Sequence, residues 1–200
     1  MKLGIFTAFS EMHKYYVKSC EELGIDYEVV DIIGPDWLEN VLNSKCDGFL
    51  CRPPSKFQER KSMFDEKLYI ISKYLKKPIY PSYDELFIYE NKRMMSYWLD
   101  LNGFPHTPTK VFYEKEKFLE FLKSAELPIV LKNNIGSTSK GVRIVKDKVT
   151  AKRIAGLVFG WSNNKLAFGY TSQMTGKVIP FPALGTMQKH YLLVQKFETI

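Results

Sequence analysis

The stretch PIVLKNNIGSTSKGVRIV, residues 128–145, consists of two short apolar runs on either side of a loop rich in Gly, Ser, Thr and Lys. The first run, residues 129–131, has β-branched character and is followed by Lys132. The second run, residues 142–145, alternates apolar and polar positions as a half-buried strand does. The stretch therefore predicts a β-hairpin whose first strand closes on Lys132.

The loop between the two runs has the residue types of an anion-binding site. Gly136 and Gly141 tolerate positive φ, so successive backbone N–H groups can turn inward around an anion. Hydroxyl groups can donate to phosphate oxygens, and lysine ammonium groups can neutralise their charge. The side chains of these types are Lys132, Ser137, Thr138, Ser139 and Lys140. The loop is therefore a candidate phosphate-binding flap.

The spacing of Gly136 and Gly141 also fits the G-x-x-x-x-G of a P-loop, but the residues after the second glycine exclude that motif. A P-loop continues with Lys and then Ser or Thr into a helix, whereas Val142 and Arg143 follow here and the chain returns to a strand. The phosphates would then lack a helix N-terminus. For this stretch alone, the remaining alternative is an ordinary hairpin loop rich in Ser and Gly.

The composition is that of a globular protein. Of the 200 residues, 45% are hydrophobic and 14% aromatic, enough for one large apolar core or two small ones. The formal net charge is +7, yet the lysines are spread along the chain and alternate with acidic residues, as at 115–117. The sequence has no cluster of basic residues interleaved with aromatic ones, so we expect no nucleic-acid partner.

Cysteine usage and the amino terminus indicate a cytoplasmic protein. Cys20, Cys46 and Cys51 show no C-x-x-C spacing, so neither a zinc site nor a disulfide framework is predicted. The start MKLGIFTAF runs into a strand pattern without the apolar segment of a signal peptide. No apolar run reaches the ~20 residues needed to cross a bilayer, so we expect no membrane partner.

The amino-terminal part predicts a small parallel α/β unit, because strand patterns alternate with helix patterns. Strands are expected at 2–9, 26–33, 47–51 and 79–80, and helices at 11–23, 36–42 and 58–74. The first turn from strand to helix, TAFSEM, has no G-x-G-x-x-G, so it is not expected to bind a dinucleotide.

Arg52 follows the third expected strand in a rigid turn that contains Pro53 and Pro54. Open α/β sheets bind ligands at the carboxyl ends of their strands. Arg52 is therefore a candidate clamp for a substrate carboxylate, with an ordinary surface arginine as the alternative.

Residues 84–200 carry a series of short motifs whose order is more specific than any one of them. The motifs are Asn91-Lys92 opening a helix, GFPHTPT at 103–109, a strand at 110–113, a helix at 116–124, Lys132, the flap at 136–142 and YLLVQKFE at 191–198. In this order they resemble the motifs of the ATP-grasp superfamily, in particular its carboxylate-amine and carboxylate-thiol ligases. Residues 1–82 resemble the α/β domain that precedes the grasp by architecture alone.

The resemblance implies an α/β fold class with two domains. Residues 1–82 would form a small parallel-sheet pre-ATP-grasp domain, and residues 83–200 the amino-terminal α+β lobe of an ATP-grasp fold, truncated at the adenine hinge. Residues 161–188 depart from the family pattern, and a hairpin is expected around 174–177.

The resemblance also implies the ligands. Lys92 and Lys132 would contact the phosphates of ATP, and the flap from Gly136 to Gly141 would cover them. The hinge residues that would face the adenine are Gln195, Lys196, Phe197 and Glu198. Mg²⁺ would accompany ATP, held by residues beyond position 200, so no metal ligand is expected in this chain.

The implied function is that of the amino-terminal part of an ADP-forming carboxylate ligase. Such a ligase activates a small-molecule carboxylate as an acyl phosphate and joins it to an amine or similar nucleophile. The alternative is a catalytically inactive nucleotide-binding or regulatory module of ATP-grasp ancestry. We expect residues 1–200 alone to be inactive, and we expect the strand at 192–194 to present an open edge through which copies self-associate.

Overall fold

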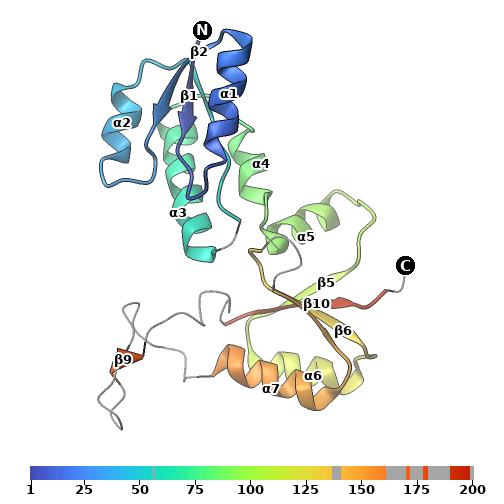
Figure 1. Cartoon of the computed structure of the whole chain (residues 1–200). Helices are drawn as coiled ribbons and strands as arrows, with labels where there is room; N and C mark the ends of the chain where they lie inside the picture. The colour runs from blue at the N-terminus through green and yellow to red at the C-terminus, as the bar shows by residue number, and fades with distance from the viewer. Residues whose placement is uncertain (56, 137–140, 161–169, 172–177, 180–189, 199–200) are drawn as a thin grey trace. The chain divides into compact units, whose positions relative to one another are not determined.

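The computed structural model describes the whole chain except positions 56, 137–140, 161–169, 172–177, 180–189 and 199–200. The chain divides into two compact units, Met1–Tyr89 and Glu90–Ile200, each with its own four-stranded sheet (Figure 1). No helix in the described ranges is long and apolar enough to span a bilayer.

The first unit is built on an entirely parallel sheet in the order β2-β1-β3-β4. Its strands are β1 (Lys2–Phe6), β2 (Asp26–Val30), β3 (Gly48–Leu50) and β4 (Ile79–Tyr80). Its helices are α1 (His13–Leu23), α2 (Trp37–Asn43), α3 (Gln58–Tyr69), continued by a π-helix at Ile70–Tyr74, and α4 (Tyr83–Ile88). The parallel α/β unit expected from the alternating patterns is confirmed. Helix α4 packs against α3, so the division between the units falls after Tyr89.

The direction of each crossover decides which face of this sheet a helix covers. The chain moves from β1 to β2 in one direction, and from β2 to β3 and on to β4 in the other. Because such crossovers are right-handed, α1 covers one face, and α2 and α3 cover the opposite face (Figure 1).

The main core of the first unit lies on the face covered by α2 and α3. Phe6 and Phe49 stack there with their ring centroids 4.6 Å apart. Gly4 makes room for this stack, because a Cβ at position 4 would lie 2.4 Å from the Phe49 ring. The other buried side chains of the cluster are Val30, Ile32, Val41, Cys51, Phe64, Leu68, Ile71 and Leu86.

Helix α3 carries an ion pair into this core. Lys61 is fully buried and donates to the Asp65 carboxylate, one turn further along α3. Burial lowers the pKa of Lys61 and raises that of Asp65, since both charged forms lose water. Each charge is therefore compensated mainly by the other.

The second unit is built on an antiparallel sheet in the order β5-β10-β6-β7. Its strands are β5 (Thr109–Phe112), β6 (Ile129–Lys132), β7 (Val142–Val145) and β10 (Leu192–Lys196). Its helices are α5 (Lys92–Leu101), α6 (Lys115–Ser124) and α7 (Lys148–Phe159). Lys132 pairs with Val142 across β6 and β7, which confirms the hairpin expected from residues 128–145.

The expectation of an open edge at residues 192–194 is wrong. Strand β10 lies inside the sheet and pairs with β5 on one side and β6 on the other. Leu192, Leu193 and Val194 are each at most 5% exposed. The two neighbouring strands come from far earlier in the chain, where no local pattern links them to β10. Self-association through this strand therefore has no open edge to use.

Alternation along the strands gives this sheet two different faces. One face packs against α6 and α7 (Figure 1). Its buried side chains are Ile129, Leu131, Val145, Leu192 and Val194 from the strands, and Phe118, Leu122, Ala151, Ala155 and Val158 from the helices. Lys132 pairs with Leu193 and Val142, so these three side chains share the other face.

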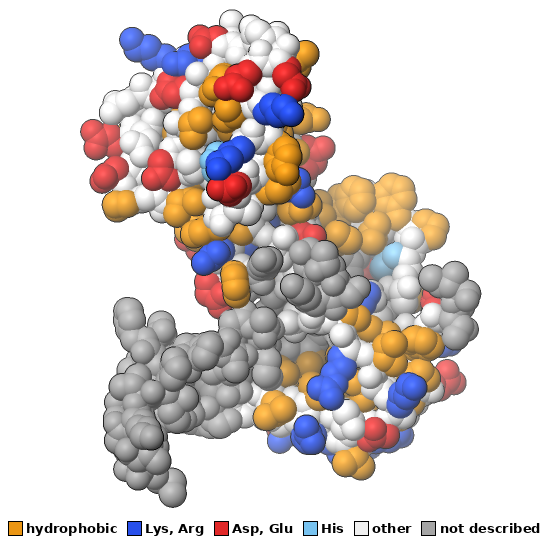
Figure 2. Space-filling view, viewed as in Figure 1, with side chains coloured by type: hydrophobic (Ala, Val, Ile, Leu, Met, Phe, Trp, Pro, Cys, Tyr) orange, Lys and Arg blue, Asp and Glu red, His pale blue; other side chains and the backbone are white. Residues whose placement is uncertain are grey.

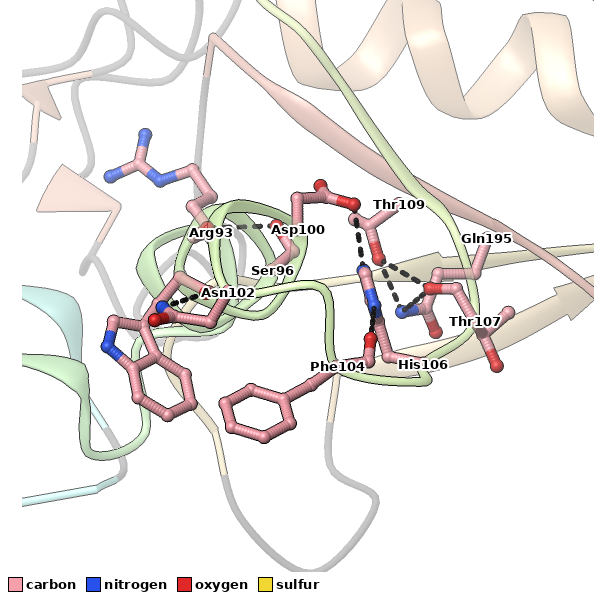
Figure 3. A network of polar contacts seen from close by, with 10 residues as sticks. Arg93, Ser96, Asp100, Asn102, Phe104, His106, Thr107, Thr109 and Gln195 are labelled. Carbon is pink, nitrogen blue, oxygen red and sulfur yellow. Dashed lines mark hydrogen bonds and ion pairs between the residues drawn. The ribbon is translucent and has the colours of Figure 1, made fainter.

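Helix α5 and the loop after it carry exposed apolar side chains, which Figure 2 shows gathered on one side of the second unit. Trp98 and Phe104 stack there with ring centroids 5.3 Å apart. Asn102 donates its side-chain N–H to the Trp98 carbonyl at 2.7 Å (Figure 3). These contacts fold the loop back onto α5 before the chain enters β5.

A separate two-stranded ladder joins β8 (Tyr170–Thr171) to β9 (Val178–Ile179) in antiparallel pairing. The ladder flanks residues 174–177, which confirms the hairpin expected there. The connecting residues, 172–177, lie outside the described residues.

The buried ion pair of α3 predicts a large loss of stability when one partner is neutralised. Asp65→Asn should lower the free energy of unfolding of the first unit by about 3 kcal/mol, because Lys61 stays buried without its countercharge. Urea unfolding, with probes in each unit, measures this change.

The matched control is Glu120→Gln on α6, which breaks the exposed pair of Glu120 with Lys123. Surface pairs of this kind contribute about 0–1 kcal/mol. Equal effects of the two substitutions would contradict the role given to the buried pair.

Candidate functional site

The flap root is the place where the chain leaves β6 and returns to β7. A backbone hydrogen bond beyond the β6-β7 ladder closes it. The Asn133 N–H donates to the Gly141 carbonyl at 2.8 Å. Gly141 has φ +81°, and a Cβ there would lie 2.6 Å from Asn133 Nδ2, so only glycine fits this turn without strain. The expected phosphate-binding residues Ser137, Thr138, Ser139 and Lys140 lie outside the described residues.

Asn134 ties the flap root to the beginning of α5. Asn134 is fully buried, and its backbone carbonyl oxygen accepts the Lys92 backbone N–H at 3.1 Å. Its side-chain Oδ1 accepts the Arg93 N–H at 2.8 Å, and its own N–H donates to the Tyr191 hydroxyl at 3.2 Å. The first N–H groups of a helix have no acceptor within the helix. Asn134 supplies two such acceptors and so fixes where α5 begins.

Lys92 and Lys132 are brought together by this arrangement. The Lys92 Nζ donates to the Gly136 carbonyl at 2.5 Å and lies 3.7 Å from the Glu90 carboxylate. Burial lowers the pKa of Lys92, and the nearby positive charge of Lys132 lowers it further, against the opposing effect of Glu90. Burial also lowers the pKa of Lys132, which has no hydrogen-bond acceptor or carboxylate partner among the described residues. The pair is thus suited to an anion.

Arg93 and Tyr191 form a second layer beside the two lysines. The Arg93 guanidinium carbon lies 4.5 Å from the centroid of the Tyr191 ring, and Tyr191 is only 8% exposed. Sequence reasoning missed Arg93, Asn134 and Tyr191 as site residues. No local sequence pattern links Asn134 or Tyr191 to α5.

A cavity of about 340 Å³ opens at the flap root. Its lining combines cationic and amide side chains with apolar side chains of α7 and the strands. The lining residues are Leu131, Lys132, Asn133, Gly141, Val142, Arg143, Ile154, Leu157, Val158, Tyr191 and Leu192. The cavity therefore adjoins Lys132 and the hairpin.

The expected adenine hinge begins with a glutamine that contacts the GFPHTPT segment. The Gln195 Nε2 donates to the Thr109 hydroxyl at 2.6 Å and to the Thr107 carbonyl at 3.5 Å (Figure 3). The preceding His106 has its Nε2 3.3 Å from the Asp100 carboxylate of α5. These contacts hold the segment between α5 and β10. Adenine binding by residues 195–198 stays a prediction.

Arg52 lies at a second cavity, of about 370 Å³, within the first unit. Its lining residues are Tyr16, Cys51, Arg52, Pro53, Pro81, Glu85, Leu86 and Tyr89. Arg52 has an exposed side chain that makes no hydrogen bond or ion pair with another described residue. Burial raises the pKa of Tyr16, and the nearby positive charge of Arg52 opposes that rise.

The described residues contain no group of three or more His, Cys, Asp or Glu side chains that could hold a metal ion.

Solved structures with a similar fold span more than this chain. A RimK domain protein ATP-grasp from Sphaerobacter thermophilus DSM 20745 matches 100% of this chain and 65% of its own, with TM-score 0.59 and 14% identity. D-alanine–D-alanine ligase from Bacillus anthracis matches 100% of this chain and 58% of its own, with TM-score 0.52 and 16% identity.

A third similar structure contains a nucleotide. N5-carboxyaminoimidazole synthase from Aspergillus clavatus, in complex with ADP and 5-aminoimidazole ribonucleotide, matches 98% of this chain and 46% of its own, with TM-score 0.64 and 13% identity. The chain thus spans about half to two thirds of the length of these proteins. No protein-family model and no curated protein matches the sequence.

The contacts of Asn134 predict that Asn134→Ala destabilises the second unit. The substitution removes the acceptor of the Arg93 N–H at a buried position, which should cost about 1–3 kcal/mol. Thermal and urea unfolding measure the loss. Asn134→Asp is the matched variant, because a carboxylate oxygen can still accept that N–H. The same loss in both variants would show that the acceptor at this position does not hold α5.

Proposed function

We propose that this chain, whose fold is that of the amino-terminal portion of ATP-grasp proteins, binds ATP and forms part of an ATP-dependent carboxylate ligase. The observation that carries this proposal is the meeting of Lys92 and Lys132 at the root of the flap, where Asn134 fixes the beginning of α5.

The lysine pair has the charge that ATP phosphates require. The two positive charges are partly buried and repel each other. Among the described residues, Glu90 is the one carboxylate within ion-pair distance of Lys92. A phosphate chain would relieve that repulsion and replace lost hydration with charge-assisted hydrogen bonds. The lysines would therefore hold the phosphates, and the flap backbone after Gly136 would orient them.

The bound ATP would supply the phosphoryl group that activates a carboxylate. The described residues do not fit a Mg²⁺ site, because they include no group of three or more His, Cys, Asp or Glu side chains that could hold a metal ion. Residues 195–198 would face the adenine, and Arg52 would hold a substrate carboxylate. The acyl group would then pass to an amine. The protein would act in the cytoplasm.

An inactive nucleotide-binding module would use the same lysine pair. The two functions differ in turnover, not in the contacts at the flap root. Binding experiments therefore test the nucleotide site under either function.

Lys132→Ala should weaken ATP binding by about 1.5–3 kcal/mol, because it removes a charge-assisted contact at the flap root. Isothermal titration calorimetry with ATP measures the affinity. The control is Lys152→Ala, which removes an exposed lysine of α7 outside the cavity lining. Unchanged affinity in Lys132→Ala would refute the assignment of the phosphate site.

The lowered pKa values of the two lysines also predict how binding depends on pH. Both lysines lose their protons below the ordinary lysine pKa of 10.5, and phosphate binding favours the protonated forms. ATP affinity should therefore fall as the pH rises through those lowered pKa values, and binding should take up protons in the same range.

Calorimetry in buffers of different ionisation enthalpy, from neutral pH upward, measures that proton uptake. Lys132→Ala should reduce it. Binding heats that do not depend on the buffer at alkaline pH would rule out a lysine-based phosphate site.

A further inference from the structure

Four aromatic side chains form a continuous row on the first unit, from the end of α3 to α4. Tyr74 meets Tyr69 edge-on with ring centroids 5.8 Å apart, and Tyr69 meets Tyr83 edge-on at 5.7 Å. Tyr83 in turn stacks on Phe87 at 5.9 Å. Tyr74 is 68% exposed and Tyr69 43%, whereas Tyr83 and Phe87 are half-buried. This aromatic row therefore leaves ring surface in water at one end and is anchored in the protein at the other.

The π-helix that continues α3 creates the aromatic row. In an α-helix, residues five apart point about 140° away from each other, so Tyr69 and Tyr74 would not meet. In the π-helix at Ile70–Tyr74, hydrogen bonds join residues five apart, as from the Leu75 N–H to the Ile70 carbonyl at 3.0 Å. Tyr74 therefore follows Tyr69 after about one turn, and the two rings come into contact. Short π-helical segments are frequent at functional sites.

The three tyrosine hydroxyls of the aromatic row are available as hydrogen-bond donors. None of them has a hydrogen-bond partner among the residues that the structure describes. A phenol hydroxyl is protonated at neutral pH and can donate. The row thus combines apolar rings with donors, and a matching ligand offers apolar groups and acceptors.

The charges beside the aromatic row favour an uncharged ligand. The Lys73 Nζ lies 5.4 Å from the Tyr83 ring centroid and 3.5 Å from the Asp84 carboxylate. Nucleic acid draws its affinity from cations that contact phosphates, and here Lys73 is already paired. Lys76 is exposed, lies two residues after Tyr74 and has no carboxylate partner within the described part of the chain. The row therefore suits a neutral segment that carries an acidic residue beside it.

The exposed area suits a short peptide better than a second copy of this chain. Tyr69 and Tyr74 together present roughly 200 Å² of side-chain surface, since an aromatic side chain has about 150–250 Å² to bury. A stable protein interface buries about 800 Å² on each partner. A second copy docked on the aromatic row alone would therefore not form a stable dimer.

We propose that the aromatic row is a docking site for a proline-rich segment of a partner protein. Such a segment adopts the polyproline II conformation, which has no internal hydrogen bonds, so its carbonyl groups are free to accept and its prolyl rings are apolar. Surfaces lined by aromatic side chains bind this conformation. The tyrosine rings contact the prolines, the hydroxyls donate to the peptide carbonyls, and Lys76 pairs with an acidic residue that flanks the prolines.

Calorimetric titration of the 200-residue chain with synthetic peptides tests the proposal. The probes are decaproline, decaproline with a glutamate at each end, and a Gly-Ser peptide of the same length. The proline peptides should bind about tenfold or more tightly than the Gly-Ser peptide, because they already have the bound conformation. The glutamates should strengthen binding at low salt. Failure of both proline peptides to bind, or equal binding by the Gly-Ser peptide, overturns the proposal, and so does tighter binding of oligothymidylate.

Substitutions in the aromatic row locate the binding. Tyr69→Leu and Tyr74→Leu keep an apolar side chain but remove the ring and the hydroxyl, so each should weaken proline-peptide binding about fivefold or more. Tyr74 is the more exposed of the two, so Tyr74→Leu keeps the test valid if Tyr69→Leu unfolds. The control is Tyr15→Leu, which removes an exposed tyrosine of α1. An equal loss in the control, or no loss in Tyr74→Leu, would overturn the proposal.

The inference does not rest on the proposed nucleotide site, since the aromatic row belongs to the first unit. Lys132→Ala should bind the proline peptides as the unsubstituted chain does. Peptide binding without ATP binding would support this proposal and refute the nucleotide site, and ATP binding without peptide binding would do the reverse.

Discussion

The hydrogen bonds of Asn134 connect the two parts of the second unit on which the candidate nucleotide site depends. The flap root follows β6, and Lys92 belongs to the first turn of α5, so the separation between them is not fixed by either element alone. Asn134 accepts the first N–H groups of α5 while its own N–H is bound by Tyr191. A helix end needs such acceptors in any case. Here Asn134, at the flap root, supplies them, and so Lys92 comes to lie near Lys132.

The two units treat buried charge in different ways. In the first unit, the fully buried Lys61 and the partly buried Asp65 neutralise each other at the core. At the flap root, Lys92 and Lys132 raise each other's electrostatic cost, and Glu90 offsets part of it. Beside Arg52, the guanidinium and the Glu85 carboxylate line one cavity and are both exposed to solvent. Charge that a protein leaves uncompensated in a cleft marks a functional site more strongly than charge that it pairs.

The sequence by itself determined the local features of the chain. Alternation of strand and helix patterns predicted the parallel sheet, and the runs around residues 128–145 predicted the hairpin that closes on Lys132. The order of the motifs predicted the ATP-grasp fold, which the similar solved structures confirm. The parallel sheet and the hairpin follow from side-chain periodicity and φ preferences within a few residues, whereas the ATP-grasp fold was implied by the resemblance of the ordered motifs to that family.

Only the tertiary structure decided the features that join distant segments. It put β10 between β5 and β6, where the sequence had suggested an open edge, because strand neighbours are chosen by packing between residues far apart in the chain. It showed Asn134 to be an acceptor for α5, although its sequence neighbourhood indicates no more than a turn. It also brought Glu85 to the cavity of Arg52, through a helix that follows a different strand. These three features depend on how whole helices and strands pack on the hydrophobic cores. No short stretch of sequence encodes that packing.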